Sequence, residues 1–296
     1  MEILLPDKYL QEKLPKTSIY KSGLVHDIYR LGNYVVKIPK TGFPDFNSEK
    51  HFLIEASSLD LLRKSGIPTP NKIQTSQITL FGKETHCLIE TFIEGIQLSW
   101  RELNGKSFSA INDIYRVCHD IKIDGFGPIN ENKRGTFSTW KNYLVHTIRN
   151  SREHFNDIKG KSLNSLFDFL EEQVGKFCFS DIDYGGKFLL VDLNPGNIFF
   201  DQKGNLLSVI DIDHPMSGDV LFEYVSIYWY NREAFEKLQK HYLHLNQAQL
   251  KRLKLYLLVH ACDVITWMSK HSMHIATDVD KLVRLHEITR KDIINK

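Results

Sequence analysis

The segment that decides the fold, residues 187–219, reads KFLLVDLNPGNIFFDQKGNLLSVIDIDHPMSGD. It contains three short apolar runs, at 188–191, 198–200 and 206–210. Turn residues such as Pro195, Gly196 and Gly204 separate these runs. Short β-rich runs between turn residues are typical of a β-hairpin. We therefore predict that this segment forms strands that fold back on one another.

Each apolar run adjoins a polar side chain: Asp192, Asn197 and Asp211. We expect the hairpin to bring these three residues together at its strand ends. An acid beside a carboxamide and a second acid is the set that phosphoryl transfer needs, because one group orients the attacking hydroxyl and two oxygen ligands hold magnesium. On the hairpin alone, the alternative that all three are ordinary turn and strand-end residues stays open.

The motif DLNPGN at 192–197, followed by VIDID at 209–213 and Gly218-Asp219, resembles the aminoglycoside phosphotransferase family. The stretches 125–140 and 256–263 resemble its hygromycin B phosphotransferase-like branch in particular. The resemblance implies an α+β, protein-kinase-like fold of two lobes. An N-terminal antiparallel sheet with one helix would form a nucleotide-binding lobe (1–92), and a mostly helical lobe with a catalytic β-hairpin would hold the acceptor (93–296).

The resemblance also implies roles for the residues of the hairpin. Asp192 would be the catalytic residue that accepts a hydrogen bond from the substrate hydroxyl. Asn197 and Asp211 would be the ligands of Mg²⁺, and Asp213 would face the acceptor. One position departs from the family motif, which usually has histidine two residues before the aspartate, where this chain has Leu190.

Lys37 lies in the apolar run 34–38 and matches the phosphate-binding lysine of the family. A lysine among apolar residues of a central strand needs a partner for its charge, whereas on an edge strand it would point to water. We expect the partner on a helix that Asn47 or Ser48 caps and that ends near residue 63. Glu55 matches the family's lysine-pairing glutamate, and Glu49 is the competing candidate.

The nucleotide would meet two further stretches. Ser22 and Gly23 lie where the family has a loop over the phosphates, although Gly23 could equally mark a strand bulge. The strand 86–92 corresponds to the hinge, where backbone groups from Glu90 to Phe92 would contact the base. Backbone contacts have no side-chain signature, so the cofactor is predicted as ATP or GTP with Mg²⁺.

The remaining chain has the apolar spacing of helices, so we expect a mostly helical second half. Asp263 lies within the apolar helix 247–269, where it would either line the acceptor pocket and meet a substrate ammonium or pair with His260. Glu223 follows Gly218-Asp219 where the family usually has an aspartate that braces the catalytic loop, and we expect the same structural role for it.

The composition fits a globular protein, with 42% apolar and 25% charged residues and a net charge of +2. This balance gives no electrostatic reason to expect a nucleic acid or membrane partner. Four well-separated cysteines and the absence of a signal-peptide pattern lead us to expect a soluble, cytoplasmic protein. The 13 histidines are scattered without ligand spacing, so we expect no histidine metal site. We also expect a monomer.

The function predicted from the resemblance is transfer of a nucleotide γ-phosphate to a hydroxyl of an aminoglycoside-type antibiotic, including hygromycin-like compounds, which confers resistance. Such substrates are polycations and need an acidic cleft. The alternatives are a metabolic kinase for a small alcohol such as choline, a sugar or homoserine, and a nucleotide-binding pseudokinase.

Overall fold

The structure is a computed structural model that describes residues 4–40, 48–71, 73–156, 163–177, 179, 182 and 185–294. The chain divides into two compact units, and each is described by itself. The first comprises Met1–Cys118, Asn130–Lys133 and Leu193–Pro215, and the second comprises the remaining chain. The first unit thus extends past the predicted lobe boundary at residue 92 and includes residues 193–215 of the segment predicted as the catalytic hairpin, but not Asp192. The assignment of functions to 1–92 and 93–296 stays a prediction.

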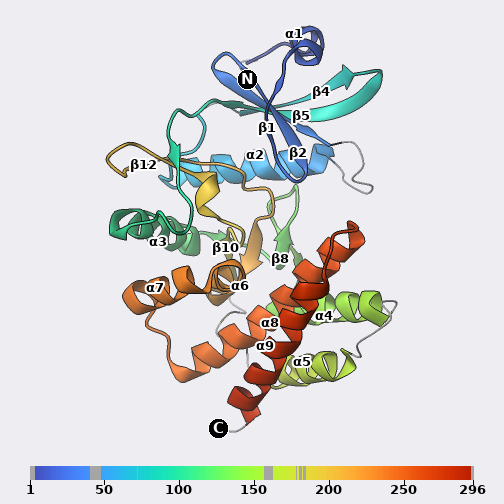
Figure 1. Cartoon of the computed structure of the whole chain (residues 1–296), viewed down its shortest axis with the longest axis vertical. Coiled ribbons are helices and arrows are strands. Elements are labelled where there is room, and N and C mark those ends of the chain that lie inside the picture. Colours follow the sequence, from blue (N-terminus) through green and yellow to red (C-terminus); the bar gives the residue numbers. More distant parts are fainter. Residues whose placement is uncertain are drawn as a thin grey trace. The chain divides into compact units, whose positions relative to one another are not determined.

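The first unit is built on a five-stranded antiparallel sheet with the order β1-β2-β3-β5-β4 (Figure 1). Its strands are β1 (Ile19–Ser22), β2 (His26–Leu31), β3 (Tyr34–Pro39), β4 (Ile73–Leu80) and β5 (Lys83–Thr91). Residues 23–25 separate β1 from β2. Gly32 and Asn33, a pair typical of two-residue hairpin loops, form the turn between β2 and β3, because Leu31 pairs with Tyr34 and Gly32 has a φ of 61°.

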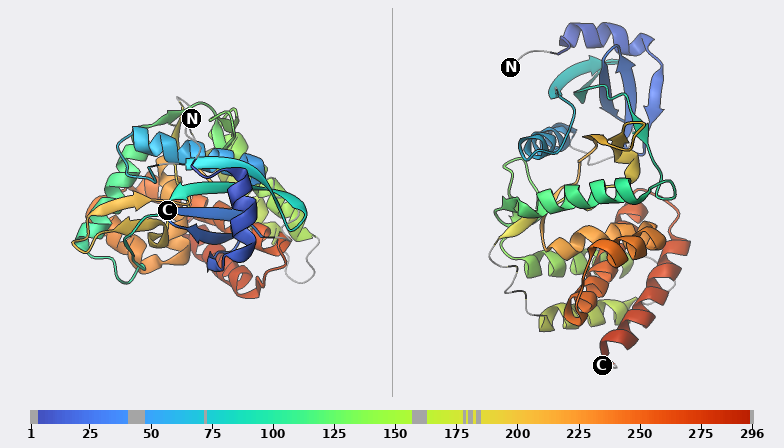
Figure 2. Two further views of the ribbon diagram at one scale, coloured as in Figure 1. Left: turned by 90° about the horizontal axis from the view of Figure 1, so that it is seen from above. Right: turned by 90° about the vertical axis from the view of Figure 1, so that its left-hand side faces the viewer.

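Helices cover the two faces of this sheet. On one face lie α1 (Asp7–Lys13) and the 3₁₀ turn η1 (Leu14–Lys16), which we did not predict (Figure 2). Their Leu10 and Leu14 pack against Val36, Ile38 and residues of β4 and β5. The predicted helix, α2 (Ser48–Lys64), packs against β4 and β5. Side chains alternate along a strand, so Lys37 points away from the face that Val36 and Ile38 share.

The rest of the first unit holds the predicted hairpin. The strands β11 (Ile198–Phe200) and β12 (Leu206–Val209) pair antiparallel, and β6 (Ile96–Gln97) joins the free edge of β11. A short 3₁₀ turn, η2 (Pro195–Asn197), precedes β11, and the helix α3 (Gly105–Asp120) follows β6 along the chain.

The second unit contains a further five-stranded sheet with the order β7-β10-β13-β8-β9. Its strands are β7 (Lys122–Ile123), β8 (Phe126–Ile129), β9 (Gly135–Phe137), β10 (Gly186–Leu189) and β13 (Met216–Gly218). The strand β10, which precedes Asp192, therefore pairs with β7 and β13 and is not part of the β11–β12 hairpin.

Helices make up most of the second unit, as predicted. They are α4 (Trp140–Asn156), α5 (Asn164–Lys176), η3 (Val220–Tyr224), α6 (Val225–Tyr230), α7 (Arg232–Tyr242), α8 (Gln247–Lys270) and α9 (Ala276–Ile294). Trp140, Phe222 and Tyr256 pack edge to face at the centre, with ring centroids 5.2 to 5.8 Å apart. Within the described part of the chain, no helix has both the length and the hydropathy to cross a membrane.

Candidate active site

Lys37 is the centre of a buried ionic cluster in the first unit. Its ammonium donates a hydrogen bond to Glu55, lies 3.0 Å from Asp211 Oδ1 and lies 3.6 Å from Glu90 Oε2. The side chains of Lys37, Glu55 and Glu90 are at most 3% exposed, while that of Asp211 is 39% exposed. The structure therefore pairs Lys37 with Glu55; Glu49, the competing candidate, is exposed on the first turn of α2.

The pKa values of the cluster follow from burial and charge. Burial disfavours the charged form of Lys37 and would lower its pKa. The negative charges of Asp211, Glu55 and Glu90 outweigh this effect and hold the pKa of Lys37 well above its usual value. Lys37 in turn lowers the pKa of Asp211, whereas burial raises that of Glu90 against the pull of Lys37. Asp211 is thus held as a carboxylate that is partly open to solvent beside a fixed ammonium.

Asn197 and Asp211 lie at the same end of the β11–β12 hairpin. Ile198 pairs with Val209, and the N–H of Ile210 donates to the carbonyl oxygen of Asn197 at 2.9 Å. Asp211 has a φ of 63°, a left-handed conformation that turns the chain directly after the strand. The predicted metal ligands are therefore neighbours in the hairpin.

The loop at Ser22 and Gly23 joins β1 to β2 and is exposed. The hydroxyl of Ser22 donates to Asp27 at 2.7 Å, and the N–H of Gly23 donates to the carbonyl oxygen of His26 at 2.8 Å. Both groups have partners within the loop.

At the predicted hinge, the N–H of Phe92 donates to the carbonyl oxygen of Asn33 at 2.8 Å. A contact from Phe92 to a nucleotide base would accordingly have to use its carbonyl oxygen or its ring. The guanidinium of Arg30 lies 3.7 Å from the centre of that ring, and Tyr20 meets the ring edge on. Sequence reasoning missed both neighbours, because no local pattern indicates a contact between strands.

Asp192 lies in the second unit, directly after β10, and is exposed. The backbone before it is held by Glu223, whose fully buried carboxylate accepts hydrogen bonds from the N–H groups of Leu190 and Val191 at 2.7 to 3.1 Å. Ser226 also donates to the carbonyl oxygen of Val191. Glu223 thus has the expected structural role of bracing this loop.

The two predicted acceptor residues have different surroundings. Asp263 is partly exposed on α8, and its charge adds to burial in raising the pKa of Tyr143. Burial lowers the pKa of His260 to about 4, so His260 is neutral at pH 7 and supplies no positive charge to Asp263. Asp213, in the first unit, lies 3.7 Å from both His51 and His214, a histidine cluster that we had not expected.

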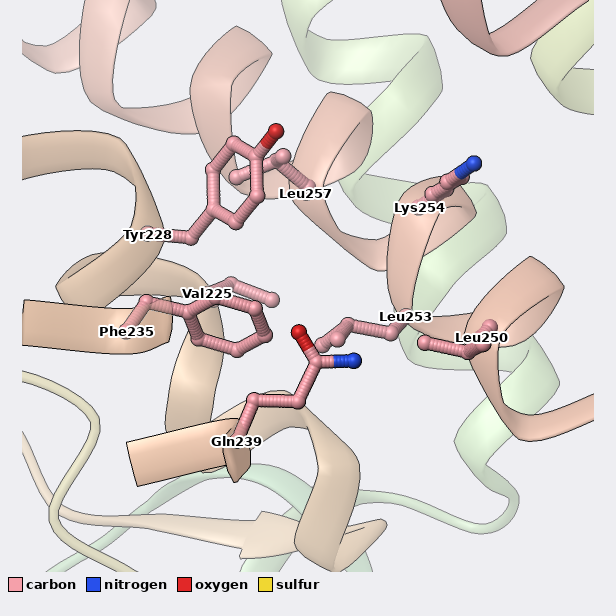
Figure 3. A pocket seen from close by; sticks show the side chains of 8 residues that line it. All are labelled: Val225, Tyr228, Phe235, Gln239, Leu250, Leu253, Lys254 and Leu257. Carbon is pink, nitrogen blue, oxygen red and sulfur yellow. The ribbon is translucent and has the colours of Figure 1, made fainter. Parts of the chain in front are cut away.

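A separate cavity of about 200 Å³ lies among α6, α7 and α8 (Figure 3). Its lining is mainly apolar and contains none of the predicted site residues: Val225, Tyr228, Phe235, Gln239, Leu250, Leu253, Lys254 and Leu257. In Figure 3 the amide of Gln239 is directed toward the middle of these side chains. The cavity lacks the carboxylates that the predicted acceptor site requires.

No protein-family model matches the sequence, and no curated protein matches it significantly. Solved structures do match over nearly the whole length of the chain. A thermostable mutant of aminoglycoside phosphotransferase APH(4)-Ia, in ternary complex with AMP-PNP and hygromycin B, is 16% identical with a TM-score of 0.75, covering 98% of this chain and 99% of that one.

Two further structures are similar. Choline kinase LicA from Streptococcus pneumoniae is 16% identical with a TM-score of 0.63, over 98% of this chain and 99% of that one. The GDP complex of a mutant aminoglycoside 2′-phosphotransferase-IIIa is 11% identical with a TM-score of 0.60, over 97% and 95%. The chain therefore has the α+β, protein-kinase-like fold that the aminoglycoside phosphotransferases share with choline kinase.

Proposed function

We propose that this protein is a small-molecule kinase that transfers the γ-phosphate of ATP or GTP to a hydroxyl of an aminoglycoside-type antibiotic, including hygromycin-like compounds. The observation that carries the proposal is the position of Lys37, buried between Glu55 and Asp211. A fixed ammonium beside a partly exposed carboxylate suits a magnesium-bound polyphosphate. The shared fold supports the same reading.

The cluster fits the predicted cofactor in its donor set and its charge. Asn197 offers an amide oxygen and Asp211 a carboxylate, which are the hard ligands that Mg²⁺ prefers. Lys37 lowers the pKa of Asp211, which keeps this partly exposed side chain a carboxylate that a divalent cation would contact. When bound, Mg²⁺ would neutralise charge on the phosphates of the nucleotide.

The chain's own residues would share the remaining work. Lys37, held by Glu55, would contact the α and β phosphates, and the loop at Ser22 and Gly23 would cover them. Asp192 would accept the hydrogen bond from the acceptor hydroxyl and direct its attack, a role that contributes on the order of 10²- to 10⁴-fold in rate. Asp213 and Asp263 remain the proposed contacts of the acceptor, and ammonium groups would suit both.

Leu190 occupies the position of the family histidine, and its surroundings explain how the loop is held without one. Leu190 is 3% exposed, and its N–H is fixed by Glu223. His119 lies 3.5 Å from the same carboxylate of Glu223. An imidazole is therefore present beside Glu223, although His119 comes from a distant part of the sequence. These contacts favour an active enzyme over the pseudokinase alternative.

The second candidate is a metabolic kinase for a small alcohol such as choline, a sugar or homoserine, which the fold shared with choline kinase supports. The test is release of nucleoside diphosphate from Mg-ATP and Mg-GTP, with aminoglycosides including hygromycin B set against choline and homoserine. Turnover with an aminoglycoside that disappears in Asp192→Asn, while nucleotide binding persists, would establish the first candidate. Full turnover by Asp192→Asn would exclude the proposed role of that residue.

A further inference from the structure

Three potential metal-ligating side chains converge in the first unit, outside the cluster around Lys37. His51 comes from α2, and Asp213 and His214 come from the segment that follows β12. The Oδ2 atom of Asp213 lies 3.7 Å from Nε2 of His51 and 3.7 Å from Nε2 of His214. One ligand atom from each residue lies within 4.8 Å of the other two.

The chemistry of this set differs from that of Asn197 and Asp211. Imidazole nitrogen together with a carboxylate suits zinc and its transition-metal neighbours, whereas Mg²⁺ prefers oxygen ligands alone. The ring of His26 packs against His51 at 5.0 Å between centroids and restricts its orientation.

We propose that His51, Asp213 and His214 form a binding site for a transition-metal ion of the zinc class. Zinc bonds of about 2.0–2.2 Å in tetrahedral geometry place ligand atoms roughly 3.3 Å apart, so the three atoms need to approach one another by about 1 Å or less for most pairs. His51 is 8% exposed and fixed on a helix, whereas the side chain of His214 is 65% exposed and can make this movement. Three protein ligands would leave one position for water.

Occupation of the site would link two segments of the first unit. The metal would tie α2, which carries Glu55, to the segment that carries Asp211. Zinc would then alter turnover of Mg-nucleotide. That consequence rests on the proposed function, whereas binding of the metal does not.

The test is a titration of the full-length chain with Zn²⁺ in competition with a chromophoric chelator, in the absence of nucleotide. The wild type is expected to show one tight site that a large excess of Mg²⁺ does not displace. His214→Asn and Asp213→Asn should each weaken it by more than the roughly 10-fold that loss of an outer-shell partner costs, because each removes a direct ligand. His244→Asn, at an exposed histidine remote in sequence from the cluster, is the control and should bind as the wild type does.

Equal zinc affinity in the wild type, His214→Asn and Asp213→Asn would overturn the proposal, as would displacement of zinc by Mg²⁺. Because His214 is exposed, its variant should keep the fold, which circular dichroism checks. Zinc binding without any kinase turnover would contradict only the proposed function. Turnover without tight zinc binding would contradict only the metal site.

Discussion

The carboxylate of Glu223 accepts a hydrogen bond from the backbone N–H of Val191 at 2.7 Å, although 32 positions separate the two residues in the chain. The same carboxylate accepts the N–H of Leu190. The direction in which Asp192 leaves β10 is therefore set by a buried charge from the segment before α6. Glu223 contacts no substrate in our proposal, yet it sets the direction of Asp192, the carboxylate that we propose to be catalytic.

Glu223→Gln should consequently lower turnover without weakening nucleotide binding. The N–H of Leu190 lies between the two carboxylate oxygens, at 3.1 and 3.0 Å, and that of Val191 lies 2.7 Å from Oε1. A carboxamide has one acceptor oxygen, and its NH₂ group would face the N–H of Leu190, so the loop would have to shift. A displacement of the reacting group by about 1 Å can cost about 100-fold in rate. Steady-state kinetics should show a lower kcat at an unchanged KM for the nucleotide; an unchanged kcat in a folded variant would rule out the positioning role.

Glu55→Gln should weaken nucleotide binding and destabilise the first unit. The substitution removes the charge that Lys37 contacts while leaving the side-chain volume, and an imperfectly satisfied buried group costs about 1–3 kcal/mol. Glu49→Gln, on the exposed side of the same helix, is the matched control and should bind nucleotide as the wild type does. Nucleotide titration and urea denaturation measure the two effects, and equal behaviour of both variants would exclude Glu55 as the functional partner.

Tyr256→Phe should destabilise the second unit. The hydroxyl of Tyr256 accepts a hydrogen bond from Trp140 Nε1 at 2.8 Å and donates to Asp219 at 2.7 Å, all at buried positions. Its removal leaves an indole N–H without that acceptor, so the free energy of unfolding should fall by about 1–3 kcal/mol. Tyr9→Phe, at a side chain that is 40% exposed, should change stability far less in the same denaturation experiment.

His260 should make the second unit sensitive to acid. Its pKa is about 4 in the folded protein, because of burial, and about 6.5 when unfolded, so the unfolded state binds more protons between these values. Stability should therefore decrease as pH falls from about 6.5 to about 4, with His260 accounting for about 2 kcal/mol at pH 5. In His260→Phe the difference in unfolding free energy between pH 7 and pH 5 should shrink by that amount, and an unaltered difference would contradict the assignment.

The sequence predicted those parts of the fold that local patterns determine. Alternation in β3 places Lys37 opposite Val36 and Ile38, and the turn at Gly32 and Asn33 sets the register of the hairpin. These signals lie within a few residues of one another. They predicted a helix after β3 but left Glu49 and Glu55 both open as partners of Lys37, and Glu55 was favoured only because it matches the family's glutamate.

No local sequence pattern indicated which distant segments of the chain would pair. One of the two partners of β10 is β13 (Met216–Gly218), a short strand that lacks a β-rich pattern, and we had placed β10 in the hairpin instead. Gly218, noted only as part of a motif, has a packing reason: a Cβ there would lie 2.3 Å from the ring of Trp140. The contacts of His51 with Asp213 and of Arg30 with Phe92 likewise arise only when the chain is folded.

Val191 has a φ of 50°, a left-handed backbone that a β-branched residue adopts only under strain of about 1–3 kcal/mol. Glycine at this position would relieve the strain, but it would also remove a side chain that is 7% exposed, whose burial is worth about 1.5–3 kcal/mol. The hydrogen bonds to Glu223 and Ser226 use the backbone N–H and carbonyl oxygen of residue 191, so glycine would keep both bonds while it widened the range of conformations open to the loop before Asp192. Strain and burial thus act in opposite directions on the stability of this one residue, and a laboratory search for thermostable variants should retain Val191 whether or not activity is part of the screen.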